Sequence, residues 1–246
     1  MGGSRHLKSL AAPFFYPIHR KEHKWVVKPS PGPHSIYSSL PLMLILRDLL
    51  RMADTSREAR RIISSGVVMV DRRVRRNYKY PVGFFDVISL ISIGKHYRII
   101  PKPVRFIDYI EINEDESYIK PLRIDDKTTV KGGATQLNLY GGYNILVGSS
   151  KNSGKNEGIE YKTFGTVIVD LRDMSVKDYI PLEEGVLALV IGGRNIGRLG
   201  RIVKIVRGMR AYRTLVTLED YNKHLFQTTL NYVYVIGREK PVIRIS

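Results

Sequence analysis

One segment, residues 40–88, constrains the fold of this chain more than any other. An apolar run is followed by TSREARRIISSG, which is typical of a capped helix that ends at a glycine, and by VVMV, which is typical of a short strand. Residues 71–79 then predict a basic hairpin, and the apolar residues from Phe85 onward predict further strands. The segment therefore predicts a small α/β unit that gathers arginines on one surface.

The expected helix after Thr55 has two chemically different faces. Thr55 and Glu58 have the spacing of a capping box, in which the threonine hydroxyl accepts from a backbone N–H group and the carboxylate reaches back. Helical spacing places four residues on an inward face: Ala59, Ile62, Ile63 and Gly66. The opposite face carries Arg57, Arg60, Arg61 and Ser64. Gly66 is suited to end the helix in a left-handed conformation.

Another helix is expected to begin near Pro41, a residue well suited to a first helical turn. Its apolar stripe consists of Leu42, Ile45, Leu46, Leu49 and Met52. Further apolar residues lie off this stripe, namely Met43, Leu44 and Leu50. We therefore expect this helix to be buried on more than one side.

The positive charge is concentrated in the first part of the chain. The net charge of the 246 residues is +17, from 40 Lys+Arg and 23 Asp+Glu. Residues 1–105 hold 20 basic and 6 acidic residues (+14), which leaves 20 and 17 (+3) for residues 106–246. A long basic surface usually meets nucleic-acid phosphates. The alternative, that the charge only aids solubility, accounts poorly for an excess that is local and rich in arginine.

Residues 1–40 are expected to form a basic extension rather than a domain, because prolines recur too often for a long helix. Its candidate RNA contacts are Arg5, His6, Lys8, Arg20, Lys21, Lys24, Trp25 and Lys28. Basic residues beside flat rings suit single-stranded or irregular RNA, in which bases stack and phosphates pair with cations. The alternative is a basic tail that packs Trp25 onto its own protein.

The remainder of the chain has the pattern of short strands separated by Gly and Asn. Residues 106–178 predict a central β-rich domain, with a polar surface loop at 148–158. In residues 179–246, β-like runs at 186–191 and 201–206 flank a Gly-rich basic turn, and NYVYVIGR predicts another strand. The fold class is therefore α+β with several domains, at residues 1–40, 41–105, 106–178 and 179–246.

Several classes of protein are disfavoured. There is no cysteine, which excludes disulfides and thiolate metal sites. Arg5, His6 and Lys8 interrupt the N-terminal segment, so no secretory signal is expected. The longest apolar run, residues 42–46, is far shorter than the ~20 residues of a membrane span. We expect a soluble intracellular protein that does not bind membranes.

Three motifs that suggest cofactor or metal chemistry are incomplete. The Gly-rich residues 192–200 precede a strand-like run, whereas a dinucleotide site needs a helix there, so we expect a tight turn in a small barrel instead. Residues 154–156 resemble the end of a phosphate loop, but its first Gly is replaced by Ser149 and its Ser/Thr by Asn156. The pattern His-x-x-Glu-His at residues 19–23 lies in a proline-flanked basic arm without a third ligand. We expect no cofactor, metal or catalytic site, and we expect the acidic residues 114–116 to be solvated surface.

Two modules resemble known families. SREARRIISSGVVMVDRRVRR resembles the S4-type RNA-binding domain, and residues 185–205, with Gly193, Gly197 and Gly200 among basic residues, resemble a KOW motif. Together with SRHLKSLAAP, PSPGPH and SLPL at the front and NYVYVIGR near the end, the chain resembles the archaeal and eukaryotic ribosomal protein S4e family over nearly its whole length. The absence of a Lys-rich tail favours the archaeal type.

The resemblance implies an S4-like domain followed by β-rich domains, one of them an SH3-like KOW barrel. It implies a non-enzymatic structural subunit of the small ribosomal subunit, located in cytoplasmic ribosomes. Its partners would be ribosomal RNA and neighbouring ribosomal proteins, without homo-oligomers. The implied RNA contacts beyond the extension are Arg57, Arg60, Arg61, Arg72, Arg73, Arg75, Arg76, Lys79, Arg194, Arg198 and Arg201. Ile196 stands where a KOW turn often has Lys, which weakens the charge there.

Two alternatives remain open. One is an RNA-modifying enzyme that uses an S4-like domain as a handle, but the residues after 105 are occupied by short β modules. The other is a regulator of translation or transcription that binds RNA transiently.

Overall fold

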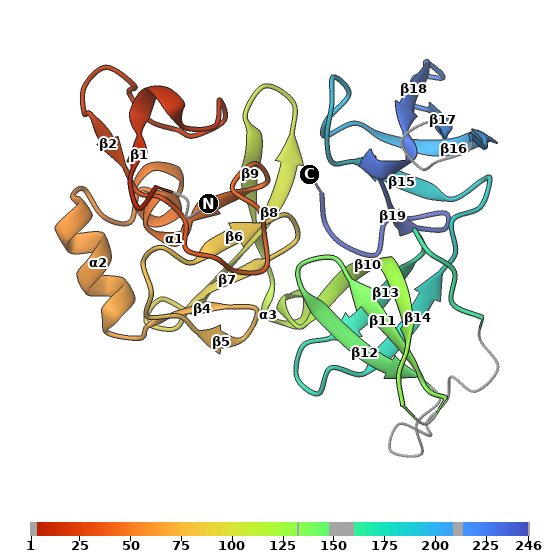
Figure 1. Ribbon diagram of the computed structural model, residues 1–246, viewed down its shortest axis with the longest axis horizontal. Coiled ribbons are helices and arrows are strands. Elements are labelled where there is room, and N and C mark those ends of the chain that lie inside the picture. The colour runs from red at the N-terminus through yellow and green to blue at the C-terminus, as the bar shows by residue number, and fades with distance from the viewer. Residues whose placement is uncertain (1–3, 132, 148–159, 209–213, 246) are drawn as a thin grey trace. The chain divides into compact units, whose positions relative to one another are not determined.

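The structure is a computed structural model that describes residues 4–131, 133–147, 160–208 and 214–245. The chain is rich in sheet and has few helices, and it divides into two compact units (Figure 1). The first unit comprises residues 1–100 and 107–117, and the second comprises residues 101–106 and 118–246. The surface loop expected at residues 148–158 and the incomplete phosphate loop at 154–156 lie outside the described residues.

The first unit combines small sheets with short helices. β1 (Leu7–Lys8) and β2 (Trp25–Val26) form a ribbon, next to a 3-10 turn at Ser9–Ala11, and β3 (Ser39–Pro41) pairs with β6 (Pro81–Gly83). The larger sheet has the order β5-β4-β7-β8-β9, formed by β5 (Arg73–Val74), β4 (Val68–Val70), β7 (Val87–Leu90), β8 (Lys95–Lys102) and β9 (Phe106–Ile112). The helices are α1 (Leu42–Leu44), which continues as a π-helical turn at Ile45–Leu49, α2 (Ser56–Ser64) and α3 (Glu114–Ser117).

Helix α2 confirms the capped helix predicted after Thr55. The Thr55 hydroxyl accepts from the Glu58 N–H at 3.2 Å, and the Glu58 carboxylate accepts from the Asp54 N–H at 3.0 Å, one residue earlier than a capping box predicts. On the inward face, Ala59 is fully buried. Gly66 ends the helix with φ +84°, the left-handed conformation expected of it.

The helix that begins after Pro41 is shorter than the apolar pattern of residues 42–52 predicts, and its second half is a wider π-helical turn. After α1 the Leu50 N–H donates to the Ile45 carbonyl at 2.7 Å, an i to i+5 bond, and Arg51 leaves the helix with φ +52°. Met52 therefore lies beyond the helix. Gly66 ends α2, but no glycine follows this earlier segment. Here the helix ends instead through a π-helical turn and Arg51 in the left-handed conformation. Burial on more than one side is confirmed, since residues 42–46 are all buried.

A tight two-residue turn presents the basic hairpin. Val70 pairs with Arg73 across β4 and β5, and the two residues between them, Asp71 and Arg72, both have positive φ (49° and 63°). The buried Asp71 carboxylate accepts from the Val87 N–H at 2.9 Å, which anchors the turn to β7. The turn that carries arginines is thus anchored by the Asp71 carboxylate, which is engaged in a hydrogen bond within the fold.

The expectation that residues 114–116 are all solvated surface is wrong for Glu116. Its side chain is paired with Arg98, which is fully buried in β8, and Arg98 Nη2 also donates to the Glu116 carbonyl at 2.9 Å. Burial lowers the pKa of the Arg98 guanidinium, although the Glu116 carboxylate acts in the opposite direction. The last residue of the acidic run thus compensates a buried cation, because an unpaired buried guanidinium would be strongly destabilising.

The second unit consists of two antiparallel five-stranded sheets. The first has the order β12-β11-β10-β13-β14, formed by β12 (Tyr143–Val147), β11 (Thr135–Leu139), β10 (Ile119–Thr129), β13 (Thr166–Asp170) and β14 (Val176–Ile180). The second has the order β18-β17-β16-β15-β19, formed by β18 (Leu225–Thr229), β17 (Leu215–Glu219), β16 (Leu199–Val206), β15 (Leu187–Val190) and β19 (Val233–Gly237). The strands predicted around residues 186–191 and 201–206 and in NYVYVIGR are confirmed.

Tyr234 joins these two sheets. Its fully buried hydroxyl accepts from the Arg123 N–H at 2.9 Å and donates to the Pro121 carbonyl at 3.0 Å. Burial raises the pKa of the phenol, which keeps the hydroxyl protonated and able to donate. A shared apolar cluster of Ile168, Ile180 and Val235 completes the junction.

Tyr234→Phe is expected to destabilise the protein by about 1–3 kcal/mol, because it leaves a buried N–H and a buried carbonyl unsatisfied. Denaturant unfolding measures the loss. Tyr232→Phe is the matched control, since Tyr232 is exposed, and it is expected to change little. Equal stability of the two variants would contradict the role assigned to the Tyr234 hydroxyl.

Candidate nucleic-acid interface

The structure places the predicted contacts at the surface to different degrees. The exposed ones are Arg5, His6, Lys8, Lys21, Lys24, Trp25, Arg57, Arg60, Arg61, Arg73, Arg76, Arg194 and Arg201. Those of intermediate exposure are Arg20, Lys28, Arg72, Arg75, Lys79 and Arg198. We call the arginines of α2 together with residues 72–79 the arginine surface, and residues 191–198 the glycine turn.

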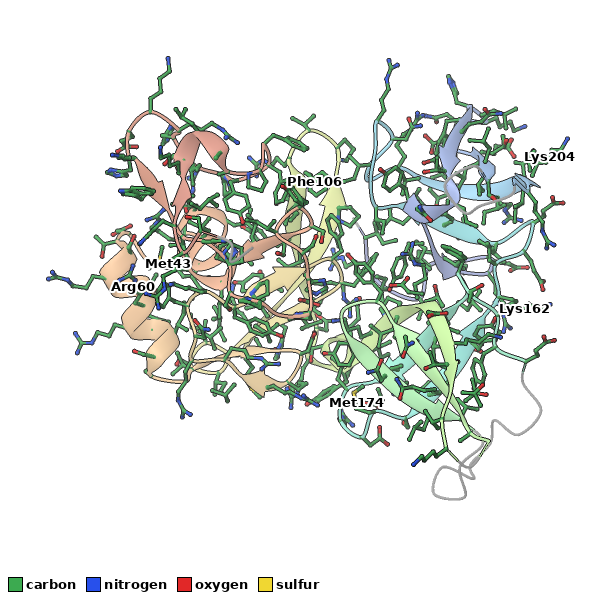
Figure 2. The ribbon with its side chains drawn as sticks, in the orientation of Figure 1. Met43, Arg60, Phe106, Lys162, Met174 and Lys204 are labelled. Atoms are coloured by element: carbon green, nitrogen blue, oxygen red, sulfur yellow. The ribbon has the colours of Figure 1, made fainter. Side chains whose placement is uncertain are left out.

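Helix α2 supplies one half of the arginine surface. Arg57, Arg60 and Arg61 are exposed on the side opposite the buried Ala59 and Ile63, as their spacing predicts (Figure 2 labels Arg60). Arg57 and Arg61 form no ion pair with any residue that the structure describes. Their charge is therefore available to an external anion.

Tyrosine rings lie beneath two of the arginines. The Arg60 guanidinium carbon lies 4.4 Å from the centroid of the Tyr78 ring, and that of Arg75 lies 4.3 Å from the centroid of the Tyr80 ring. Lys79 Nζ lies 5.6 Å from the centroid of the same Tyr78 ring. Cation–π contacts orient a cation without neutralising it. These rings hold the basic side chains while their charge stays available.

The backbone of the tyrosine segment is fixed by the start of α1. The N–H groups of Leu42 and Met43, which have no partner within the helix, donate to the carbonyls of Tyr80 and Tyr78 at 2.9 and 3.1 Å. The buried start of α1 thus fixes the backbone that carries the two rings. Tyr78 and Tyr80 were not among the predicted contacts, although the alternation of Tyr with Arg and Lys in residues 75–80 was a usable signal.

Arg76 covers the end of α2. A Cβ placed on Gly66 would lie 3.2 Å from Arg76 Nη2, so the guanidinium rests against the glycine. The carboxyl end of a helix carries partial negative charge and favours a cation there. Gly66 therefore both ends the helix and makes room for Arg76, which connects the two halves of the arginine surface.

Arg20 in the N-terminal segment has a structural use that the sequence did not reveal. Its guanidinium donates to the carbonyls of Ser9, Ala12 and Pro13 at 3.2, 2.9 and 2.7 Å. Lys28 Nζ likewise donates to the Ser4 carbonyl. These cations hold residues 4–28 in their fold, so their contribution to an RNA contact is reduced.

Trp25 is the exposed aromatic residue of this segment. Its side chain lies on β2 and is 51% exposed. The His6 ring lies 5.5 Å from it between centroids, and Lys24 Nζ lies 5.4 Å from its ring centroid. An exposed indole beside a basic group and a second ring is suited to stack an unpaired base.

Close packing against the protein's own residues explains two glycines of the glycine turn. A Cβ on Gly192 would lie 2.5 Å from the Tyr232 ring, and a Cβ on Gly197, which has φ +75°, would lie 2.5 Å from Pro103 Cδ. Ile196 is buried, which accounts for an apolar residue at this position. The turn is thus closely packed on its own protein.

The two arginines of the glycine turn differ in availability. Arg198 lies 4.4 Å from the centroid of the Phe226 ring and 3.4 Å from an Asp220 carboxylate oxygen, and it donates to Asn195 Oδ1 at 3.4 Å. Arg194 is exposed and has no hydrogen-bond or ion-pair partner among the described residues. Arg194 is therefore the stronger candidate contact, and Arg198 braces the turn.

Within the described residues, no group of three or more His, Asp or Glu side chains could hold a metal ion. Residues 19–23 form a turn, in which Glu22 and His23 lie 3.8 Å apart. In the same described part of the chain, no helix is long and apolar enough to cross a membrane.

Comparison with known proteins gives three adjoining family matches. Residues 1–37 match the RS4NT domain, residues 41–88 the S4 domain and residues 93–176 the ribosomal family S4e. The chain is 51% identical over 245 residues to the small ribosomal subunit protein eS4 of Staphylothermus marinus, covering 100% of this chain and 97% of that one. The chain belongs to the ribosomal S4e family.

Further members of the S4e family match the chain over most of its length. The small ribosomal subunit protein eS4 of Aeropyrum pernix is 50% identical over 99% of this chain and 96% of its own length. The crystal structure of the 30S ribosomal protein S4e from Thermoplasma acidophilum superimposes with a TM-score of 0.68 at 25% identity, covering 85% of this chain and 99% of that one. The S4 domain match coincides with α1, α2 and the arginine surface, so the resemblance in this segment is confirmed.

Gly197→Ala is expected to cost about 1–3 kcal/mol of stability, because strain at positive φ adds to overlap with Pro103. Gly185→Ala is the matched control, since Gly185 has φ +92° but nothing within 4 Å of its added Cβ. Thermal unfolding of both variants separates the cost of backbone strain from the cost of overlap with Pro103. Equal losses would show that the approach to Pro103 contributes nothing.

Proposed function

We propose that this chain is a structural protein of the small ribosomal subunit that binds ribosomal RNA. The arrangement of the arginine surface is the observation that supports this most. Arg60 and Arg75 lie over rings and Arg76 lies at a helix end, whereas arginines used only for stability would be neutralised by carboxylates. Its partners are the RNA of the small subunit and neighbouring ribosomal proteins, without homo-oligomers, and it carries no catalytic site.

The contacts are proposed to clamp phosphates and not to read a sequence. Arg57 and Arg61 lie about one helical turn apart on a rigid helix, and guanidinium groups bind phosphate oxygens in pairs. The N-terminal segment is proposed to add stacking through Trp25, and Arg194 a contact on the glycine turn. This division accords with RNA recognition by shape and irregular strands.

We further infer that the second sheet of the second unit is an SH3-like KOW barrel. Its strand order β18-β17-β16-β15-β19 and the Gly-rich connection between β15 and β16 support this assignment. The four-domain division of the chain, with boundaries at residues 40, 105 and 178, also remains a proposal.

Arg57→Ala with Arg61→Ala is expected to weaken binding to a small-subunit ribosomal RNA transcript by about tenfold or more and to flatten the salt dependence by about two phosphate contacts. Filter binding at several salt concentrations measures both quantities. Arg238→Ala is the control, since it removes an exposed arginine paired with Asp178 in the second unit. An unchanged dissociation constant in the α2 variant, with folding intact, would overturn the role of this face.

Sedimentation of a native lysate on a sucrose gradient tests the ribosomal role itself. The protein is expected to travel with small subunits at one copy each and to remain after a wash with about 0.5 M salt, because many phosphate contacts act together. A transient regulator would wash off, and an RNA-modifying enzyme would remain near the top of the gradient. Either result would contradict the proposal.

A further inference from the structure

The connection between β8 and β9 contains a strained turn. The Arg105 N–H donates to the Pro103 carbonyl at 2.8 Å, and Val104 between them has φ +72°. This is a three-residue γ-turn with a positive central φ, the rare and strained form. A β-branched residue is the least suited to such a conformation, and glycine would adopt it without strain.

Within the described residues, no contact explains a valine at this position. Its side chain is 99% exposed, so it contributes almost nothing to a core. Phe106, labelled in Figure 2, begins β9 directly after the turn and also has a positive φ of 66°. Strain that is kept on an exposed apolar side chain points to a contact made outside the chain.

The turn is held rigidly despite its exposure. Gly197 of the glycine turn lies against Pro103 and the Lys102 Cα so closely that an added Cβ would be 2.5 and 2.8 Å away. The same glycine turn carries Arg194, which is exposed and has no partner among the described residues. Close backbone packing thus brings residues 102–105 and the glycine turn together on one surface.

The charge around Val104 identifies the class of ligand. Lys102 and Arg105 flank it and are exposed, and residues 101–106 contain no acidic residue. A protein partner would favour an apolar centre with charges of both signs around it, whereas a turn whose own six residues supply only cations matches phosphates. A lone apolar side chain between two cations can pack on a ribose or a base of irregular RNA.

We propose that the turn at residues 102–105 is an additional RNA contact, in which Lys102 and Arg105 bind phosphates and Val104 packs against the nucleotide between them. This inference rests on the proposed function, and it adds residues that neither the motifs nor the family resemblance indicated. The glycine turn positions the contact through Gly197 and extends it through Arg194.

The test uses the full chain and a transcript of the small-subunit ribosomal RNA of Staphylothermus marinus. Lys102→Gln with Arg105→Gln is expected to weaken binding by about threefold to tenfold at about 0.1 M salt and to flatten the salt dependence by about one to two contacts. Val104→Gly relieves the backbone strain, so its melting temperature is expected to stay equal or rise while RNA affinity falls by about threefold. Arg238→Gln is the control for loss of an exposed cation.

The outcomes separate this contact from the proposed function. Unchanged affinity in both turn variants, with weakened binding in the Arg57→Ala, Arg61→Ala variant, overturns the turn contact and leaves the proposed function intact. Absence of binding by the unmodified protein overturns both. Unchanged RNA affinity together with poorer incorporation into small subunits would assign the turn to a protein neighbour and would also overturn the proposal.

Discussion

The gathering of like charge on the arginine surface, α2 and residues 72–79, is the constraint on which the rest of the structure depends. Arginines that must stay available to an external anion cannot be neutralised by carboxylates, yet their mutual repulsion must be tolerated in the free protein. In this chain, the partial negative charges of aromatic rings and of a helix end stabilise the arginines without neutralising them. Arg60 and Arg75 lie over tyrosine rings, and Arg76 lies at the carboxyl end of α2. The apolar burial of α1 supports this arrangement, because its first N–H groups hold the carbonyls of Tyr78 and Tyr80.

Basic residues divide into those whose charge is exposed, as at Arg57, and those whose donors hold the fold. Arg98 is buried with Glu116, Arg20 is satisfied by three backbone carbonyls, and Arg198 is braced by Asp220. Composition treats these residues and Arg57 alike, since all add one charge. Their partners decide the difference, because a guanidinium whose donors are already used has less to offer a phosphate. The candidate interface is therefore smaller than the count of arginines suggests.

Local patterns in the sequence predicted those elements whose causes are local. Helix α2 follows from its cap, its period and Gly66, and the strands around the glycine turn follow from alternation. The π-helical turn at Ile45–Leu49 and the partners of Arg20 were not predictable in this way, because they depend on burial and on carbonyls brought close by the fold. The same holds for Glu116, whose partner is 18 residues away. Contacts over long sequence separations carry no local signature.

The glycine turn shows how the physical reason for glycines can differ from the one that the sequence suggests. A Gly-rich basic turn suggests a backbone that approaches RNA, yet two of its glycines make room for Tyr232 and Pro103 of the same chain. Each close approach fixes the turn more firmly than a side chain would, since backbone packed on a ring or a proline has little freedom to shift. A rigid turn loses less entropy on binding than a mobile one. In the proposed RNA contact, the glycines thus act indirectly, by fixing the positions of Arg194 and the γ-turn.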